Sequence, residues 1–416
     1  MKGSFKKDKI KNICRVFSGA TPSTDNTSFW NGDILWITPN DLSKLRTPYF
    51  SNTERKITLE GLNGCSTHLL PKGSLVMSSR APIGYLAIAD HDFATNQGCK
   101  SFSFYDNYDS LFFYYCLKNQ IEKLKVLGEG TTFAEISKSY IEEFEIYFPE
   151  DKSEQIAIAC ILKTVDEAIE KTENLIAKYQ NIKTGLMQDL LTKGIDENGN
   201  IRNKTTHRFV KKNGIEVPEN WEVFHLENIC KKITDGSHFS PKPQVEGRLI
   251  GNVKDMKEDG FNFESCTKIL ESDFQTLKLQ NCSPEKGDVL LSKDGTIGRV
   301  LFFNLDFEMV VLSSIAILRP REDFDGTYLS YLLKSEYFYK QLIALESGSA
   351  LRRIVLKDIR SLKFPFPNTK EEQNRISNRL NQIDNYIQNE NAYLSKLLKK
   401  KSGLMQDLLS GKVRVN

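Results

Sequence analysis

The sequence lacks the short motifs that carry the common catalytic chemistries. It has no GxxxxGKS/T phosphate-binding loop, no GxGxxG turn, no GxSxG nucleophile elbow and no D/N/S-PP-F/Y stretch of an amino-methyltransferase. Its five histidines show no HExxH spacing, and its eight cysteines are too scattered to form a CxxC clip. The absences argue against nucleotide-binding, hydrolytic and zinc-dependent enzymes, and indicate free thiols rather than disulfides.

Long apolar runs are missing as well. No run reaches the roughly 18–20 residues that span a bilayer, and residues 1–14 are charged without the apolar centre of a signal peptide. We therefore expect a cytoplasmic location. A length of 416 residues with 39% hydrophobic side chains is typical of a globular protein of two or more domains. The net charge of +3 does not by itself indicate a nucleic-acid partner.

A duplication dominates what is present. GLMQDLL occupies residues 185–191 and returns 218 positions later, at 403–409. The same shift places the dipeptide EQ at 154–155 on the EQ at 372–373. A repeat at fixed spacing decides how the rest of a chain is interpreted.

The duplication extends upstream with small drifts in the offset. KGSLVMSSRAPIG (72–84) aligns with KGDVLLSKDGTIG (286–298) at a shift of 214, and KNIC (11–14) aligns with ENIC (227–230) at 216. Insertions in loops explain such drift. The chain is therefore two copies of one plan.

Each copy begins with about 150 residues in which short β-rich runs are bounded by Gly, Pro and Asn. A helical segment is expected at 109–125 in the first copy and at 325–344 in the second. Each copy ends in a long helix with apolar residues at 3-4 spacing, interrupted at Thr172, which aligns with Glu390. The packing positions are Leu162, Val165, Ile169, Ile176, Tyr179, Leu186, Leu190, Leu380, Ile383, Ile387, Leu394, Leu397, Leu404 and Leu408.

This spacing predicts an antiparallel, coiled-coil-like pair of helices joining two α/β (α+β) domains related by a pseudo-twofold. The alternative is two unrelated surface helices, each packed on its own domain. The predicted boundaries are 1–150 and 217–367 for the globular domains, 151–193 and 368–416 for the helices, and 194–216 for a polar linker.

Several strand-to-loop stretches have side chains suited to DNA. An arginine fork fits guanine or phosphate, amides pair with adenine, lysines contact phosphate, and Asp294 could accept from a cytosine amino group. For each residue, the alternative is a polar turn on the surface. The candidates are Thr38, Asn40, Ser78, Ser79, Arg80, Asn96, Gln97, Lys100, His238, Asn252, Lys254, Ser292, Lys293, Asp294 and Arg299.

Two further patterns have competing interpretations. Asp41, followed by Glu54 and Lys56, formally matches the D…ExK arrangement of metal-dependent nucleases, although ExK recurs by chance in so charged a chain. The lysines at 399–401 indicate either a solvated helix end or a phosphate or subunit contact. We predict neither a catalytic centre nor a metal site in this chain.

With these stretches in place, the chain resembles the specificity subunits of type I restriction–modification systems. The resemblance lies in WITPNDL (36–42), SSRAPIG (78–84), GSHFSPKP (236–243), GNVKDM (251–256) and the EQ-led helices ending in GLMQDLL. It implies two target-recognition domains, each reading one half of a bipartite DNA site, with the helices as the spacer that sets the gap.

The resemblance also implies partners and cofactors. Two modification subunits would bring S-adenosylmethionine and methylate adenine N6, and restriction subunits would add ATP- and Mg-dependent translocation and cleavage. This chain itself would bind no cofactor. It departs from the family pattern at Cys65 and Cys99, and its first half lacks the lead-in seen at VPENW (217–221). The competing interpretation is a protein-interaction scaffold with paired binding domains.

Overall fold

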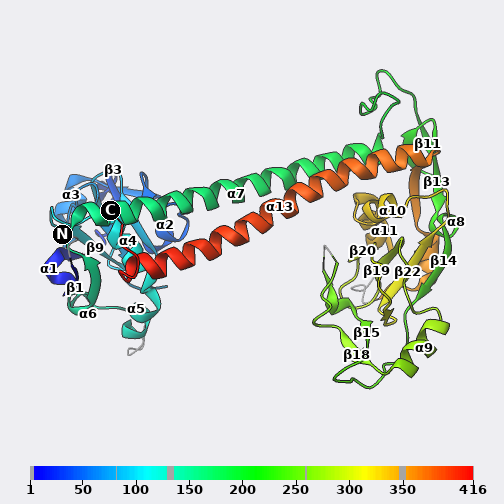
Figure 1. Ribbon diagram of the computed structural model, residues 1–416. Coiled ribbons are helices and arrows are strands. Elements are labelled where there is room, and N and C mark those ends of the chain that lie inside the picture. Colours follow the sequence, from blue (N-terminus) through cyan, green and yellow to red (C-terminus); the bar gives the residue numbers. More distant parts are fainter. Residues whose placement is uncertain (1–3, 81, 129–134, 258–259, 346–352, 416) are drawn as a thin grey trace. The chain divides into compact units, whose positions relative to one another are not determined.

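The computed structural model describes residues 4–80, 82–128, 135–257, 260–345 and 353–415 of the chain (Figure 1). Helices and strands alternate in both halves, and two helices are much longer than the others. In the part of the chain that is described, no helix is both long enough and apolar enough to cross a membrane.

The chain divides into two compact units, and each long helix runs from one unit into the other. Unit 1 comprises Met1–Asn174 and Ala392–Asn416, and unit 2 comprises Leu175–Asn391. Helix α7 (Lys152–Thr192) begins in unit 1 and ends in unit 2, whereas α13 (Lys370–Leu409) does the reverse (Figure 1). Each unit therefore contains one helix start and one helix end.

Both long helices begin and end on local signals in the sequence. The Asp151 carboxylate accepts a hydrogen bond from the Ser153 N–H (2.9 Å) at the start of α7. The Thr369 hydroxyl accepts one from the Glu372 N–H (3.4 Å) at the start of α13. These side chains satisfy amides that a helix start leaves unpaired. Gly194 and Gly411 each lie two residues after the last helical residue, and their φ angles of +65° and +72° suit glycine.

Unit 1 is built on a five-stranded sheet of order β2-β9-β6-β7-β4, a three-stranded sheet of order β5-β3-β8 and the pair β1-β10. Its strands are β1 (Phe5–Lys9), β2 (Cys14–Ser18), β3 (Trp30–Ile37), β4 (Tyr49–Phe50), β5 (Arg55–Ile57), β6 (Leu75–Ser78), β7 (Leu86–Ala89), β8 (Phe93–Thr95), β9 (Cys99–Phe104) and β10 (Glu145–Pro149). Its shorter helices are α1 (Ile10–Ile13), η1 (Thr27–Phe29), α2 (Pro39–Ser43), α3 (Leu59–Asn63), α4 (Ser110–Asn119), α5 (Ile121–Gly128) and α6 (Lys138–Glu143).

Unit 2 is built on sheets of order β14-β22-β19-β20 and β18-β15-β21 and the pair β13-β23, with two small hairpins in addition. Its strands are β11 (Phe209–Lys212), β12 (Ile215–Pro218), β13 (Trp221–His225), β14 (Cys230–Asp235), β15 (Arg248–Gly251), β16 (Met256–Lys257), β17 (Gly260–Phe261), β18 (Thr267–Ile269), β19 (Asp288–Ser292), β20 (Val300–Phe303), β21 (Val310–Val311), β22 (Ile315–Pro320) and β23 (Lys363–Pro367). Its shorter helices are α8 (Leu226–Ile229), η2 (Val253–Asp255), α9 (Glu271–Leu279), α10 (Gly326–Leu332), α11 (Glu336–Leu345) and α12 (Leu356–Ser361).

The two units repeat one register. In unit 1 Leu75 of β6 faces Phe102 of β9, and in unit 2 Val289 of β19 faces Leu318 of β22. β3 pairs antiparallel with β5 and parallel with β8, just as β15 pairs with β18 and β21. The predicted α/β class with two copies is thus confirmed. The expected connector at 194–216 differs, because it includes β11 and the start of β12, which form an antiparallel hairpin.

The long helices pack antiparallel within each unit. In unit 1 Lys401 of α13 lies 2.5 Å from Asp166 of α7, and in unit 2 Lys183 of α7 lies 2.5 Å from Asp384 of α13. The four residues are related by the 218-residue shift. None of the predicted packing positions is exposed, and Thr172, which interrupts the apolar spacing, is also buried. The pair is therefore a mutual interface rather than two unrelated surface helices.

The repeated GLMQDLL segments also contribute to the cores of the globular domains. Leu190 and Leu191 of α7 belong to the main core of unit 2, beside Trp221. Leu408 and Leu409 of α13 belong to the main core of unit 1. Burial of a leucine side chain contributes roughly 1.5–3 kcal/mol. The end of each helix therefore anchors it in the globular domain formed by the other copy.

Candidate nucleic-acid interface

The turns that follow β3 and β15 are held by the same capping box. In unit 1 the Asp41 carboxylate accepts a hydrogen bond from the Thr38 N–H (2.9 Å), and the Thr38 hydroxyl accepts one from the Asp41 N–H (3.3 Å). In unit 2 the Asp255 carboxylate accepts from the Asn252 N–H at 2.9 Å. Reciprocal capping fixes the entry into a short helix. The turn presents Asn40 in unit 1 and Lys254 in unit 2, both exposed.

The same capping explains the nuclease-like arrangement. The second oxygen of Asp41 accepts a hydrogen bond from the Glu54 N–H at 2.9 Å, so backbone amides engage both of its oxygens. Glu54 in turn accepts from Lys44 at 2.9 Å and from Asn40 at 3.2 Å. Among the residues that the structure describes, no group of three or more His, Cys, Asp or Glu could hold a metal ion. Asp41 therefore has a structural task, and Asp255 repeats it.

A buried serine closes the loop that follows β6 and the one that follows β19. The Ser78 hydroxyl donates to the Pro82 carbonyl (2.8 Å) and accepts from the Tyr85 N–H (2.9 Å). The Ser292 hydroxyl donates to the Thr296 carbonyl (2.6 Å) and accepts from the Arg299 N–H (2.8 Å). Both serines are fully buried, so their hydroxyls shape the loops rather than meet a partner.

Each loop is backed by a buried lysine, but the lysine lies on β9 in unit 1 and directly after β19 in unit 2. In unit 1 Lys100 of β9 is 5% exposed and lies 3.3 Å from Glu135. In unit 2 Lys293, directly after β19, is 1% exposed and lies 3.3 Å from Asp235. A buried ammonium needs a carboxylate partner because desolvation of an unpaired charge is strongly unfavourable. Both lysines act as internal counter-ions.

In each unit the polar turns meet at one corner. A side chain on Gly98 would lie within 3.3 Å of Arg80, Asn96 and Pro39, so the three loops of unit 1 converge on this glycine. In unit 2 the Ser314 hydroxyl donates to Asn252 at 3.1 Å. We define the polar corner as residues 38–41, 78–80, 96–98, 100 and 135 in unit 1, and residues 235, 252–255, 292–294, 312–314 and 353 in unit 2.

The polar corner of unit 2 is tied together by a further contact. The Arg299 guanidinium donates to the carbonyls of Val253 and Met256 at 3.2 and 3.1 Å. In unit 1 the side-chain amide oxygen of Asn96 makes a local bond, accepting from the Gly98 N–H at 3.0 Å. Loops held in this way present their side chains in a defined geometry.

The candidate DNA-contacting residues fall into three groups by exposure. Exposed side chains can reach a duplex directly and half-buried ones can do so from the loop rims, whereas buried ones position the loops. The exposed group is Asn40, Gln97, His238, Lys254 and Arg299; the half-buried group is Thr38, Arg80, Asn96, Asn252 and Asp294; the buried group is Ser78, Ser79, Lys100, Ser292 and Lys293. For the first two groups, DNA contact stays a prediction. For the buried group we replace it with a structural role.

Sequence reasoning missed the residues that complete the corner. Glu135 lies 3.7 Å from Arg80, and Arg353 lies 3.4 Å from Asp294. Asp235 also pairs with His238, at 3.4 Å. The partners of Arg80 and Asp294 are 55 and 59 positions away along the chain, beyond the reach of any local pattern. Glu135 and Arg353 are identified in the structure because each forms the same isolated backbone bridge, with Arg80 and Asp294 respectively.

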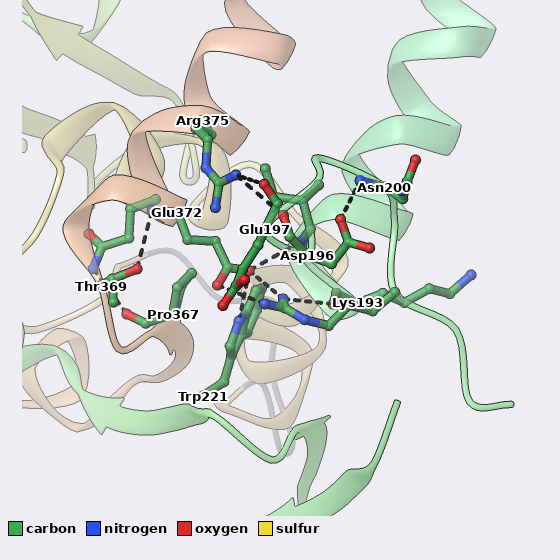
Figure 2. A network of polar contacts seen from close by, with 12 residues as sticks. Lys193, Asp196, Glu197, Asn200, Trp221, Pro367, Thr369, Glu372 and Arg375 are labelled. Atoms are coloured by element: carbon green, nitrogen blue, oxygen red, sulfur yellow. Dashed lines mark hydrogen bonds and ion pairs between the residues drawn. The ribbon is translucent and has the colours of Figure 1, made fainter. Parts of the chain in front are cut away.

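A second polar network, which we call the clasp, ties the start of each long helix to the segment that follows the other long helix; Figure 2 shows the network of unit 2. In unit 2 the Glu372 carboxylate is held by Arg202, with a second bond at 3.0 Å, and by the Trp221 indole N–H at 3.1 Å. It also accepts from the Ile195 N–H at 3.2 Å. Figure 2 shows Arg375 beside this cluster, donating to the carbonyls of Asp196 and Glu197.

Unit 1 has a clasp built on the corresponding glutamate, with its arginine 5 residues after GLMQDLL instead of 11. Glu154 at the start of α7 accepts two hydrogen bonds from Arg414, at 2.7 and 2.6 Å. The Arg414 guanidinium also lies 5.0 Å from the centre of the Phe5 ring, where unit 2 has Trp221. Bidentate arginine–carboxylate pairs are among the stronger polar contacts in proteins. Each arginine therefore fixes one long helix against the other.

Comparison with known proteins agrees with this architecture. The family described as type I restriction modification DNA specificity domain matches residues 3–178 and again 218–399. The chain is 29% identical over 416 residues to the type I restriction enzyme MjaIX specificity subunit of Methanocaldococcus jannaschii, covering 98% of this chain and 93% of that protein. It is 30% identical to the MjaVIII specificity subunit of the same organism, over 74% of this chain and 71% of that protein.

Solved structures share the fold. The crystal structure of a type I restriction–modification S subunit from M. genitalium is similar with a TM-score of 0.62 and 18% identity, covering 98% of this chain and 96% of that one. A chain from a type I restriction–modification assembly is similar with a TM-score of 0.55 and 17% identity, covering 98% and 99%. The matched family is one of recognition domains, so the chain is a recognition subunit rather than an enzyme. It belongs to the type I restriction modification DNA specificity family and carries two copies of the family's domain.

Proposed function

We propose that the chain recognises a bipartite DNA sequence, with unit 1 reading one half-site and unit 2 the other. The observation that carries the proposal is the polar corner: the two units repeat one backbone frame and place different side chains on it. Base edges in the major groove differ in their pattern of donors and acceptors. Equal frames with unequal side chains suit two half-sites of different sequence.

We further propose that α7 and α13 set the number of base pairs between the half-sites. The two helices have 41 and 40 residues, and a helix of about 40 residues is roughly 60 Å long. Both are clasped at the start by a buried carboxylate and anchored at the end by the GLMQDLL leucines. A spacer held at both ends suits the task of keeping one gap length.

The proposed partners are two modification subunits, which would bind S-adenosylmethionine and methylate adenine N6, and restriction subunits that use ATP and Mg. One structurally similar chain comes from a study of complex assembly in a type I system, which supports a role within a multi-subunit complex. Exposed apolar side chains on the long helices suit docking of partner helices. They are Ile156, Ile182, Tyr386, Tyr393 and Leu398.

The proposal predicts salt-sensitive binding. Exposed cations at the polar corners and near them, including Lys254 and Arg299, suit phosphate contacts that position the protein without reading sequence. Each phosphate contact releases counter-ions, so the logarithm of affinity falls linearly with the logarithm of salt concentration. Affinity must therefore be compared at a fixed salt concentration.

The test is to express the chain with its cognate modification subunit and sequence methylated adenines across the host genome. The proposal predicts one motif made of two specified half-sites separated by a fixed run of unspecified bases. An undivided motif, or no methylation by a complex shown to assemble, contradicts it. A scaffold that binds only proteins would leave the methylation pattern independent of this chain.

A further inference from the structure

Each polar corner contains the same two-residue bridge with its charges exchanged. In unit 1 Arg80 pairs with Glu135 as an isolated antiparallel bridge, and in unit 2 Asp294 pairs with Arg353 in the same way. In unit 1 the N–H of Ile136, which follows Glu135, donates to the carbonyl of Ser79 at 3.0 Å. In unit 2 the N–H of Ile354, which follows Arg353, donates to the carbonyl of Lys293 at 2.8 Å. Arg80 thus corresponds to Asp294, and Glu135 to Arg353.

The exchange reverses the order of donor and acceptor across the corner. In unit 1 the loop after β6 carries the guanidinium, and the segment leading to α6 carries the carboxylate. In unit 2 the loop after β19 carries the carboxylate, and the segment leading to α12 carries the guanidinium. The backbone frame is common to both units. The units differ in whether the loop carries the guanidinium and the opposing segment the carboxylate, or the reverse.

A buried lysine leaves the arginine of each corner free to change partner. Glu135 lies 3.3 Å from buried Lys100, and Asp294 lies 3.8 Å from buried Lys293. Each carboxylate therefore keeps a positive neighbour when its arginine moves away. Leaving a carboxylate without any counter-ion would be strongly unfavourable, and this arrangement avoids it.

The arginines themselves are held loosely at the surface. The Arg80 side chain is 38% exposed and 3.7 Å from its carboxylate, and the Arg353 side chain is 52% exposed and 3.4 Å from its own. Charge-assisted hydrogen bonds between such groups are normally 2.7–2.9 Å long. Surface ion pairs of this kind contribute little to stability. Both guanidinium forks are therefore available to an external acceptor.

We propose that Arg80 and Arg353 are specificity-determining residues, each reading a G·C base pair in the half-site of its own unit. The adjacent carboxylate, Glu135 or Asp294, accepts from the cytosine of the same pair. Because donor and acceptor exchange sides of the frame, the two units read the pair in opposite orientations. This inference rests on the proposed function and adds base identity to it.

The carboxylate is the reason to expect a base rather than a phosphate. An anion 3.4–3.7 Å from the guanidinium repels a phosphate brought to the same fork, whereas the guanine edge is neutral. Guanine O6 and N7 match the arginine fork, and a carboxylate can accept from the cytosine amino group. Arginine beside Glu or Asp is thus complementary to the major-groove edge of G·C.

The experiment uses the full chain assembled with its cognate modification subunit, and maps methylated adenines for wild type, Arg80→Ala and Arg353→Ala. Each alanine variant should relax one G·C position in one half-site, with preference at that position falling on the order of tenfold. The other half-site should stay as specific as in wild type. Arg80→Lys should relax the same position, because lysine keeps the charge but lacks the fork.

Matched controls are Lys72→Ala and Lys286→Ala. They remove exposed cations shortly before the starts of β6 and β19, away from the polar corners at the ends of these strands, and should leave the motif unchanged. Thermal melting of every variant checks folding. A uniform loss of methylation at all sites would identify the arginines as phosphate contacts and overturn the inference. A bipartite wild-type motif that the arginine variants leave unchanged overturns the inference alone. A wild-type complex without a bipartite motif removes the proposed function as well.

A double exchange tests the orientation. Asp294→Arg with Arg353→Asp gives unit 2 the donor–acceptor order of unit 1, and Lys293 keeps its contact with Asp235 at 3.3 Å. The preferred base pair at that position should change from one orientation of G·C to the other. Retention of the wild-type base pair, in a variant with wild-type melting, overturns the proposed reading by donor order.

Discussion

The two clasps hold the same glutamate of the duplicated plan, Glu154 or Glu372, but differ in their burial. In unit 2 the Arg202 side chain is 9% exposed and its carboxylate also accepts from the indole of Trp221. In unit 1 the Arg414 side chain is 23% exposed and lies against Phe5, which offers no hydrogen bond. Duplicated ion pairs can therefore keep the same pairing while the exposure of the arginine, and with it the expected contribution to stability, differs.

The largest expected effect is the loss of the carboxylate from the more buried clasp. Glu372→Ala leaves the Arg202 charge and the Trp221 N–H buried without their acceptor, and should destabilise the chain by about 3–5 kcal/mol. Glu154→Ala should cost about 1–3 kcal/mol, because Arg414 is better placed to find water. Denaturant unfolding measures both. Lys204→Ala, which breaks an exposed pair, is the control, and equal losses for the two glutamates would contradict the comparison.

Glycines at the helix ends sharpen the comparison. A Cβ on Gly194 would lie 2.4 Å from the Trp221 ring, and one on Gly411 would lie 3.0 Å from the Phe5 ring. Both have positive φ, so alanine should cost about 1–3 kcal/mol at either site, with the larger loss at Gly194. Thermal melting compares them. Gly185→Ala is the matched control, since nothing lies near its Cβ and removing a helix glycine should stabilise by about 0.5–1 kcal/mol.

The clasp of unit 1 should also respond to pH. Hydrogen bonds from Arg414 lower the pKa of Glu154 from its ordinary value of 4.5. A carboxyl group with a depressed pKa in the folded state contributes stability above its unfolded pKa and loses it as pH falls through the folded value. The stability difference between wild type and Arg414→Ala should therefore shrink as pH falls below 4.5. Denaturant unfolding on both sides of that pH checks this, and a difference independent of pH would contradict the pairing.

The smallest effect concerns the thiols, which also differ between the units. Burial raises the pKa of Cys14 in unit 1 and of Cys230 in unit 2 to about 12, so neither forms thiolate near neutral pH. Cys160 of unit 1 is exposed and Cys65 is half-buried, whereas all three cysteines of unit 2 are buried. A maleimide should label unit 1 in the native chain and spare unit 2. Rapid native labelling of Cys230, located by peptide mass spectrometry, would contradict the packing of unit 2.

The sequence was most informative where the signal was local or repeated. The 218-residue shift predicted the two helices and their antiparallel packing, because apolar spacing is set by helix geometry. The clasp was not predicted, since Arg202 and Glu372 are 170 positions apart and only the fold brings them together. Asp41 was weighed as a nuclease residue, although its carboxylate caps a turn.

The polar corner was predicted only in part, for a different reason. Lys100 lies on β9 whereas Lys293 directly follows β19, so aligning the two copies cannot match them. Both were predicted as DNA contacts because surface and buried lysines look alike in a sequence. Arg80 and Asp294 were predicted with the correct loops but without their partners, Glu135 and Arg353. Side-chain type indicates chemistry, whereas exposure depends on the finished fold.

The central claim, that two separately reading units are spaced by the helical pair, is tested most directly by lengthening both helices together. Seven residues inserted after Asn174 in α7 and after Asn391 in α13 add about two turns, or roughly 10 Å, to each. The methylation motif of the complex should keep both half-sites and gain about three base pairs of gap, given a rise of roughly 3.4 Å per base pair. An unchanged gap, or altered half-sites in a complex that still assembles, would contradict the account.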